Sequence, residues 1–205
     1  MKARYKFSAG ANPMKRVKTR WLEKIKRMEI FENISKEIVQ RAQRIKMVLT
    51  DNDGVLTDGG VFYGENGETF KRFNIRDGMG VERLRKHAGV ETGIITGEIS
   101  PSVRTRSEKL RISELHLGIK DKTAVLNDIL KRHSLDVSEI AYIGDDTNDV
   151  DVLSVVGLAA CPNDAMIFAK NKAHYICENK GGHGAFRELA ELIIWAKQQS
   201  INHNL

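Results

Sequence analysis

The sequence predicts an α/β fold in which helices cover both faces of a doubly wound, mostly parallel sheet, and three observations carry this prediction. From residue 45 onward, short apolar runs alternate with segments of helical periodicity, which is typical of parallel strands joined by right-handed crossovers. Segment 61–73 departs from that alternation, because two extended runs flank Asn66-Gly67, a strong signal for a β-hairpin. Most of the apolar runs also end in polar residues, and open parallel sheets bind their ligands at that edge.

Each element is expected from the residues of its own segment. Strands are predicted at the apolar runs 45–50, 92–96, 114–117, 140–144, 158–161 and 175–177. Helices are predicted near 78–88, 100–110, 121–133, 149–155, 164–171 and 184–199. A further amphipathic helix is predicted over residues 29–44, because Ile34 and Ile38 belong to a series at helical spacing, with Asn33 and Ser35 as possible N-caps.

Length and charge divide the chain into a folded domain and an appendage. The 205 residues suffice for one compact domain over residues 29–200, preceded by a mobile basic leader over residues 1–28. Residues 1–46 hold 14 Lys and Arg against 4 Asp and Glu, a net charge of +10, whereas the remaining residues carry −4. We therefore expect no nucleic-acid partner for the folded domain. The role of the leader stays open between a solvated arm, an upstream start and the binding of a polyanion.

Composition excludes several classes of protein. With 41% hydrophobic and 29% charged residues, the chain is neither disordered nor fibrous. No apolar stretch is long enough to cross a membrane, and no signal peptide is recognisable, so we expect a cytoplasmic protein without a membrane partner. The two cysteines, Cys161 and Cys177, are expected to be reduced.

Two acidic clusters follow two of the predicted strands. Asp51 and Asp53 come directly after the first strand, and Asp145, Asp146 and Asp149 follow the strand at 140–144. Carboxylates gathered at one edge of a sheet repel one another unless a cation or a proton compensates. Hard oxygen ligands suit Mg²⁺, so the sequence predicts a magnesium site where the two clusters meet.

Two further residues are expected at the same edge. Thr96 and Gly97 end the strand between the clusters, and they offer a hydroxyl and backbone N–H groups to an anion. Lys122 opens the helix at 121–133, where a helix N-terminus already favours phosphate.

These residues together resemble the four motifs of the haloacid-dehalogenase superfamily: residues 51–54, Thr96, Lys122 and residues 144–149. The resemblance implies a Mg²⁺-dependent phosphatase in which Asp51 is the nucleophile and forms an aspartyl phosphate. Asp53 would serve as general acid and base, and its backbone carbonyl would join Asp51 and Asp145 on the metal. Thr96 and Lys122 would hold the transferring phosphoryl group. Asp146 and Asp149 would either support the metal ligands from behind or orient Lys122.

The spacing between the motifs leaves no room for a cap domain, so the hairpin at 61–73 is the one spare segment. Together with the tail and helix at 181–199, it resembles the capless family of 3-deoxy-D-manno-octulosonate 8-phosphate phosphatases and the related nonulosonate 9-phosphate phosphatases. That resemblance implies a homotetramer in which hairpin and tail line the active site of an adjacent protomer. It also makes Arg76, Gly97 and Arg187 candidates for contacting a small sugar acid phosphate.

The choice of substrate depends on two residues that follow Thr96 in the sequence. Glu98 and Lys109 are similar to residues of the branch that acts on nine-carbon acids of the KDN or N-acylneuraminate type, so we expect a 9-phosphate substrate. The alternative is 3-deoxy-D-manno-octulosonate 8-phosphate. Asn52 departs from the family, which usually has an apolar residue there. An alternative of another class keeps the fold as a non-catalytic module for regulation or oligomerisation, although all four motifs are intact.

Overall fold

The computed structural model describes Phe31 and residues 33–203, apart from the side chains of residues 200–203. The chain divides into two units, Met1–Ile34 and Ser35–Leu205. All elements described below belong to the second unit, which begins somewhat later than the boundary expected after residue 28. The predicted leader at residues 1–28 lies outside the described residues.

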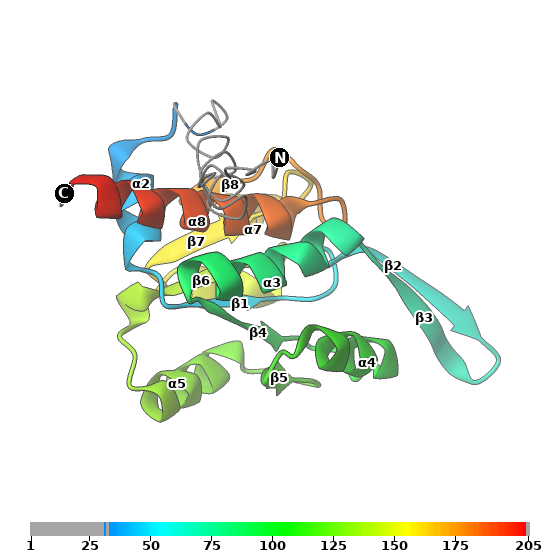
Figure 1. The fold of residues 1–205 in the computed structure, drawn as a ribbon. Coiled ribbons are helices and arrows are strands. Elements are labelled where there is room, and N and C mark those ends of the chain that lie inside the picture. Colours follow the sequence, from blue (N-terminus) through cyan, green and yellow to red (C-terminus); the bar gives the residue numbers. More distant parts are fainter. Residues whose placement is uncertain (1–30, 32, 204–205) are drawn as a thin grey trace, which may run out of the picture. The chain divides into compact units, whose positions relative to one another are not determined.

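The second unit is built on a six-stranded sheet in which every pair of neighbouring strands is parallel, as predicted (Figure 1). Its strands are, in spatial order, β5 (Glu114–His116), β4 (Glu91–Ile95), β1 (Met47–Thr50), β6 (Ile140–Ile143), β7 (Leu158–Cys161) and β8 (Tyr175–Ile176). The central strand β1 pairs Thr50 with Ile94 of β4 and with Ile143 of β6. This register brings the residues that follow β1, β4 and β6 to one edge of the sheet.

Helices cover both faces of the sheet. They are α2 (Lys36–Arg44), α3 (Ile75–Ala88), α4 (Pro101–Leu110), α5 (Lys122–His133), α6 (Val150–Leu153), α7 (Ile167–Lys170) and α8 (Ala185–His203). On one face α8 packs against α2 and α3. On the other, the buried side chains of α5 and α6 join those of β1 and β6 in one apolar core, which includes Leu49, Leu126, Tyr142 and Val152. The strands β1, β6 and β7 are buried on both faces, so they read as continuous apolar runs in the sequence.

Several helix boundaries differ from the predictions, and the two largest shifts are at the start of the first predicted helix and at the end of the last. The helix predicted over residues 29–44 begins at Lys36, because Ser35 is the N-cap and its hydroxyl accepts the backbone N–H of Ile38. Residues 29, 30 and 32 lie outside the described part of the chain. The C-terminal helix extends to His203, beyond the predicted end at residue 199.

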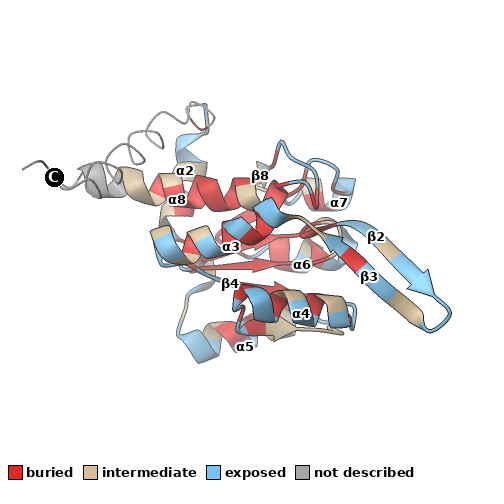
Figure 2. Ribbon diagram, turned by 45° about the vertical axis from the view of Figure 1, so that its right-hand side comes forward, coloured by how far each residue is buried: buried red, intermediate tan, exposed pale blue. Residues whose placement is uncertain are grey.

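The predicted hairpin forms a separate two-stranded antiparallel sheet that projects from the body of the domain (Figures 1 and 2). It consists of β2 (Thr57–Gly64) and β3 (Gly67–Phe73), so it begins four positions before the predicted residue 61. The rings of Phe62 and Phe70 stack with centroids 4.5 Å apart, yet both side chains remain half exposed. Among the described residues, no cap domain is inserted between the elements, and no helix is long and apolar enough to span a membrane.

Candidate active site

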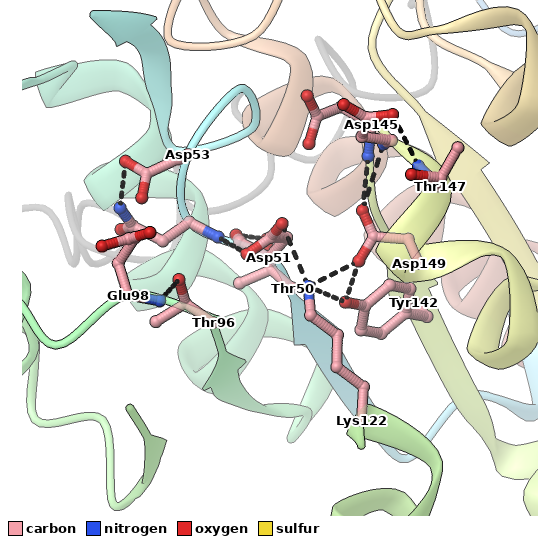
Figure 3. A network of polar contacts seen from close by, with 12 residues as sticks. Thr50, Asp51, Asp53, Thr96, Glu98, Lys122, Tyr142, Asp145, Thr147 and Asp149 are labelled. Carbon is pink, nitrogen blue, oxygen red and sulfur yellow. Dashed lines mark hydrogen bonds and ion pairs between the residues drawn. The ribbon is translucent and has the colours of Figure 1, made fainter. Parts of the chain in front are cut away.

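The residues that follow β1, β4 and β6 line a cavity of about 320 Å³ at the carboxyl edge of the sheet. Its lining consists of Asp51, Asp53, Gly54, Gly59, Thr96, Gly97, Glu98, Asp145, Asp146, Thr147 and Asn148. The two acidic clusters predicted from the sequence therefore meet in one place, and Figure 3 shows Thr96 and Glu98 on the same side as Asp53.

Three carboxylates form the centre of this site. One oxygen each of Asp51, Asp145 and Asp149 lies within 4.8 Å of the others. Burial, reinforced by the charge of Asp149, raises the pKa of Asp51 to about 7. Burial and the charges of Asp51 and Asp149 raise the pKa of Asp145 to about 8. Carboxylates that resist ionisation because they are crowded and partly desolvated fit a hard divalent cation, whose charge would remove the repulsion.

This cluster contains one carboxylate more than those of the predicted metal ligands. Asp149, predicted to lie behind the ligands or to orient Lys122, contributes that carboxylate and also pairs with Lys122, whereas Asp53 was predicted to bind metal through its backbone carbonyl. Asp149 is fully buried, and its Oδ2 accepts the backbone N–H of Asp145 at 2.9 Å and that of Asp146 at 3.3 Å. It thereby holds the loop that carries Asp145.

Lys122 lies behind the carboxylates and outside the cavity lining (Figure 3). Its Nζ is 3.0 Å from Asp51 Oδ2 and 2.7 Å from Asp149 Oδ1, and it donates to the hydroxyl of Tyr142 at 3.2 Å. Burial disfavours its charge, but the charges of Asp51 and Asp149 outweigh that effect and raise its pKa. In this geometry Lys122 neutralises and orients the carboxylates from below, as a buried cation paired on two sides.

The carboxylate of Asp53 is held by three donors. Lys71 Nζ lies 2.5 Å from its Oδ2. Its Oδ1 accepts from Asn52 Nδ2 at 3.0 Å and from the hydroxyl of Thr57 at 3.3 Å. Lys71 belongs to β3, so the hairpin reaches directly into the active site.

Comparisons with known proteins agree with this geometry. Residues 95–189 match the family model of the haloacid dehalogenase-like hydrolases. The 3-deoxy-D-manno-octulosonate 8-phosphate phosphatase KdsC of Haemophilus influenzae is 37% identical over 161 residues, which are 78% of this chain and 89% of that protein. The chain belongs to the haloacid dehalogenase-like hydrolases. It is accordingly a phosphoric monoester hydrolase.

Two solved structures resemble this haloacid dehalogenase-like hydrolase closely. The crystal structure of the phosphatase of the same name from Yersinia pestis has a TM-score of 0.78 and 36% identity, and covers 81% of this chain and 89% of its own. The phosphatase of the same name from Moraxella catarrhalis, solved in complex with a magnesium ion, a phosphate ion and a KDO molecule, has a TM-score of 0.75 and 35% identity. That match covers 82% of this chain and 98% of the Moraxella chain.

The loop after β4 of this hydrolase lies where the sequence predicts it. Thr96, Gly97 and Glu98 all line the cavity. The hydroxyl of Thr96 accepts the backbone N–H of Glu98 at 3.3 Å, and its own N–H donates to the carbonyl of His116 at 3.0 Å. The neighbouring strand β5 thus fixes the position of Thr96.

Lys122, expected to hold the phosphoryl group, lies outside the cavity lining, and four further predicted residues also take other positions. Asp146 lines the cavity but does not contact Lys122, because its side chain caps the following turn by accepting the N–H of Thr147. The remaining three do not line the cavity: Arg76, Lys109 and Arg187. Arg187 donates instead to Glu191, one helical turn along α8, at 2.7 Å, while Arg76 and Lys109 lie exposed on α3 and α4.

The glycine-rich tail of this hydrolase packs against the loop after Asp51 in its own chain. Gly182 donates its N–H to the carbonyl of Val55 at 2.8 Å. A Cβ on Gly181 would lie 1.8 Å from the carbonyl oxygen of Gly54. These glycines are therefore required by close backbone approach, and they place the tail next to the active site of its own chain.

Two residues of the site were not predicted from the sequence. Lys71 occupies an alternating strand, where a lysine most often faces solvent. Tyr142 lies within an apolar run and looks like an ordinary core residue, yet its buried hydroxyl donates to Asp149 Oδ1 at 2.6 Å. Tyr142 carried one signal, since a tyrosine within an apolar run needs a partner for its hydroxyl, whereas the burial of Lys71 follows only from the fold.

Proposed function

We propose that this chain hydrolyses 3-deoxy-D-manno-octulosonate 8-phosphate with the help of Mg²⁺. The observation that carries the proposal is the arrangement of Asp51, Asp145 and Asp149 within 4.8 Å of one another beside Thr96, in a chain 37% identical to a phosphatase of that name. The residues present fit magnesium through the carboxylate oxygens of Asp51 and Asp145, with the backbone carbonyl of Asp53 as the expected third ligand, while Asp149 beside them holds Lys122 and the loop of Asp145. The bound ion would supply positive charge that lets two anions, nucleophile and phosphate, approach each other.

The chain's own residues then account for both half-reactions. A carboxylate oxygen of Asp51 attacks phosphorus, the bond from phosphorus to the sugar oxygen breaks, and the departing alkoxide takes a proton from Asp53. Water next attacks the aspartyl phosphate, Asp53 takes the proton of that water, and inorganic phosphate leaves with Asp51 regenerated. The hydroxyl of Thr96 and the N–H of Gly97 hold phosphoryl oxygens. Lys122 keeps Asp51 and Asp149 oriented throughout.

The eight-carbon acid replaces our preference for a nine-carbon acid. That preference required Glu98 and Lys109 to act together, but only Glu98 lines the cavity. The relatives reported above are named for the eight-carbon phosphate, which supports the alternative.

A panel of sugar acid phosphates tests this choice. We expect kcat/KM for 3-deoxy-D-manno-octulosonate 8-phosphate to exceed that for a nine-carbon 9-phosphate by about 10-fold or more, since missing or misplaced polar contacts cost at least that much. The measurement is phosphate release at saturating Mg²⁺, with p-nitrophenyl phosphate as the common reference. A higher kcat/KM for the nine-carbon acid would contradict the proposal.

We further propose that a second copy of the chain completes the site, within a homotetramer. Five of the residues that line the cavity are acidic, and no Lys or Arg is among the lining residues. The proposed substrate, in contrast, carries both a phosphate and a carboxylate. The exposed aromatic residues Phe62, Tyr63 and Phe70 give the hairpin a surface suited to burial against another copy.

Light scattering checks this assembly. Phe62→Ser with Phe70→Ser should reduce the molar mass in solution to that of a smaller species, because it removes the stacked aromatic pair. It should also lower kcat/KM for the sugar acid phosphate more than for p-nitrophenyl phosphate, which has no carboxylate. A wild-type protein that is monomeric at working concentration would refute this part of the proposal.

A further inference from the structure

Asn52 is an unusual residue to find buried between the two catalytic aspartates. Its side chain is fully inaccessible to solvent, and its Oδ1 has no hydrogen-bond partner among the described residues. Thr92 Oγ1 is the other buried side-chain atom in that state within the described part of the chain. A buried polar atom without a partner destabilises a fold, so an apolar side chain of similar shape would be the more stable choice at position 52.

The orientation of the Asn52 amide explains why its oxygen has no hydrogen-bond partner. Its Nδ2 donates to Asp53 Oδ1 at 3.0 Å. The reverse orientation would place two acceptor oxygens against each other at that distance, which is repulsive. The amide therefore leaves Oδ1 unpaired as the consequence of directing its N–H₂ group at Asp53.

A second donor reaches Asp53 from the hairpin. The side chain of Lys71 is fully buried, although it belongs to a hairpin whose tip is exposed, and its Nζ lies 2.5 Å from Asp53 Oδ2. Glu68, also on β3, lies 3.6 Å from the same Nζ and accepts a hydrogen bond from Ser100, the N-cap of α4. The lysine is thus paired with a second carboxylate of its own strand as well as with Asp53.

We propose that Asn52 and Lys71 are positioning residues that hold the two oxygens of Asp53 from opposite sides and aim this carboxyl group at the sugar oxygen. The inference rests on the proposed phosphatase function and adds to it a role for the hairpin in proton transfer. Asp53 needs such support, because it lies on a loop and its carboxylate is partly exposed. A reacting group displaced by about 1 Å can lose a large part of its effect on rate.

The test uses two variants that each remove one unpaired buried polar atom. Asn52→Leu should raise or preserve Tm in protein free of divalent ions, but lower kcat for the sugar acid phosphate roughly 10-fold, a part of the 10²–10⁴-fold that acid–base catalysis contributes. Thr92→Val, the matched control, should preserve Tm and leave kcat unchanged. If Asn52 serves only the fold, Asn52→Leu will instead lower Tm while kcat stays at the wild-type value, and the inference fails.

The choice of leaving group gives a readout that a structural role would not change. A p-nitrophenolate leaves without a proton, whereas a sugar alkoxide requires one from Asp53. Asn52→Leu and Lys71→Met should therefore lower kcat for the sugar acid phosphate several-fold more than for p-nitrophenyl phosphate, with KM little changed. Lys71→Arg, which keeps a donor, should restore part of the loss.

Failure of this inference can be told apart from failure of the proposed function. A wild-type protein that hydrolyses neither ester refutes the function and the inference with it. A wild-type protein that is active, with variants that lose both esters equally or lose neither, refutes only the positioning role. Lys71→Met also keeps the test decisive if Asn52→Leu does not fold.

Discussion

Asp51→Asn should lower kcat for every phosphate ester by about 10³-fold or more, because an amide cannot act as the nucleophile that forms the aspartyl phosphate. Asp51 lies at the carboxyl end of β1, lines the cavity and belongs to the carboxylate cluster. The measurement is steady-state phosphate release with p-nitrophenyl phosphate and with the sugar acid phosphate. An unchanged rate would remove the nucleophile from the proposed mechanism.

Two observations should accompany that loss. The Tm of Asp51→Asn in the absence of divalent ions should be no lower than that of the wild type, since burial already raises the pKa of Asp51 to about 7 and an amide carries no charge to desolvate. Asp128→Asn is a suitable control, because Asp128 is exposed on α5 and pairs with Arg132 away from the cavity. Its rate should match the wild type.

Asp145→Asn should raise the Mg²⁺ concentration for half-maximal activity by about 100-fold or more, because it replaces a charged ligand by a neutral one. Activity at a fixed, low Mg²⁺ concentration should fall accordingly and recover in part at high concentration. Magnesium titrations followed by rate and by Tm measure the same change independently. Equal titration curves for wild type and variant would exclude Asp145 as a metal ligand.

The same variant has a pH signature in protein stripped of divalent ions. Burial and the neighbouring charges raise the pKa of Asp145 from 3.8 in the unfolded chain to about 8 in the folded one. The folded state therefore binds this proton more tightly, and stability is lost as pH rises through the interval from about 4 to about 8. Asparagine cannot ionise, so the Tm of Asp145→Asn should exceed that of the wild type by more at about pH 9 than at about pH 5. A difference independent of pH would contradict the assigned cause.

Most of the fold and the centre of the site were predictable from the sequence. The alternation of apolar runs and helical segments specified a parallel sheet, because few other topologies join such elements with short connections. Residues that end parallel strands must share one edge of the sheet, and this rule alone brought Asp51, Thr96 and Asp145 together. The Asn66-Gly67 turn predicted the hairpin, although the first strand begins at Thr57 and not at the predicted residue 61.

Other features of the site depended on side-chain directions, which cannot be predicted from the periodicity of the sequence. Asp146 and Asp149 are equivalent in the motif, but the turn after β6 directs the first to Thr147 and buries the second beside Asp51 and Lys122. Lys109 lies on a helix, and the sequence does not state which face that helix turns to the cavity.

By itself, the sequence determined which strand ends carry acids, which loop offers a hydroxyl and where a lysine begins a helix, since these properties follow from chain order and from the geometry of parallel strands. Only the tertiary structure decided that Lys71 of the hairpin and the amide of Asn52 hold Asp53, and that Arg187 pairs within its own helix. The physical reason is that such contacts join segments whose relative placement is set by packing of the whole domain, where a single rotation about a side-chain bond changes the partner.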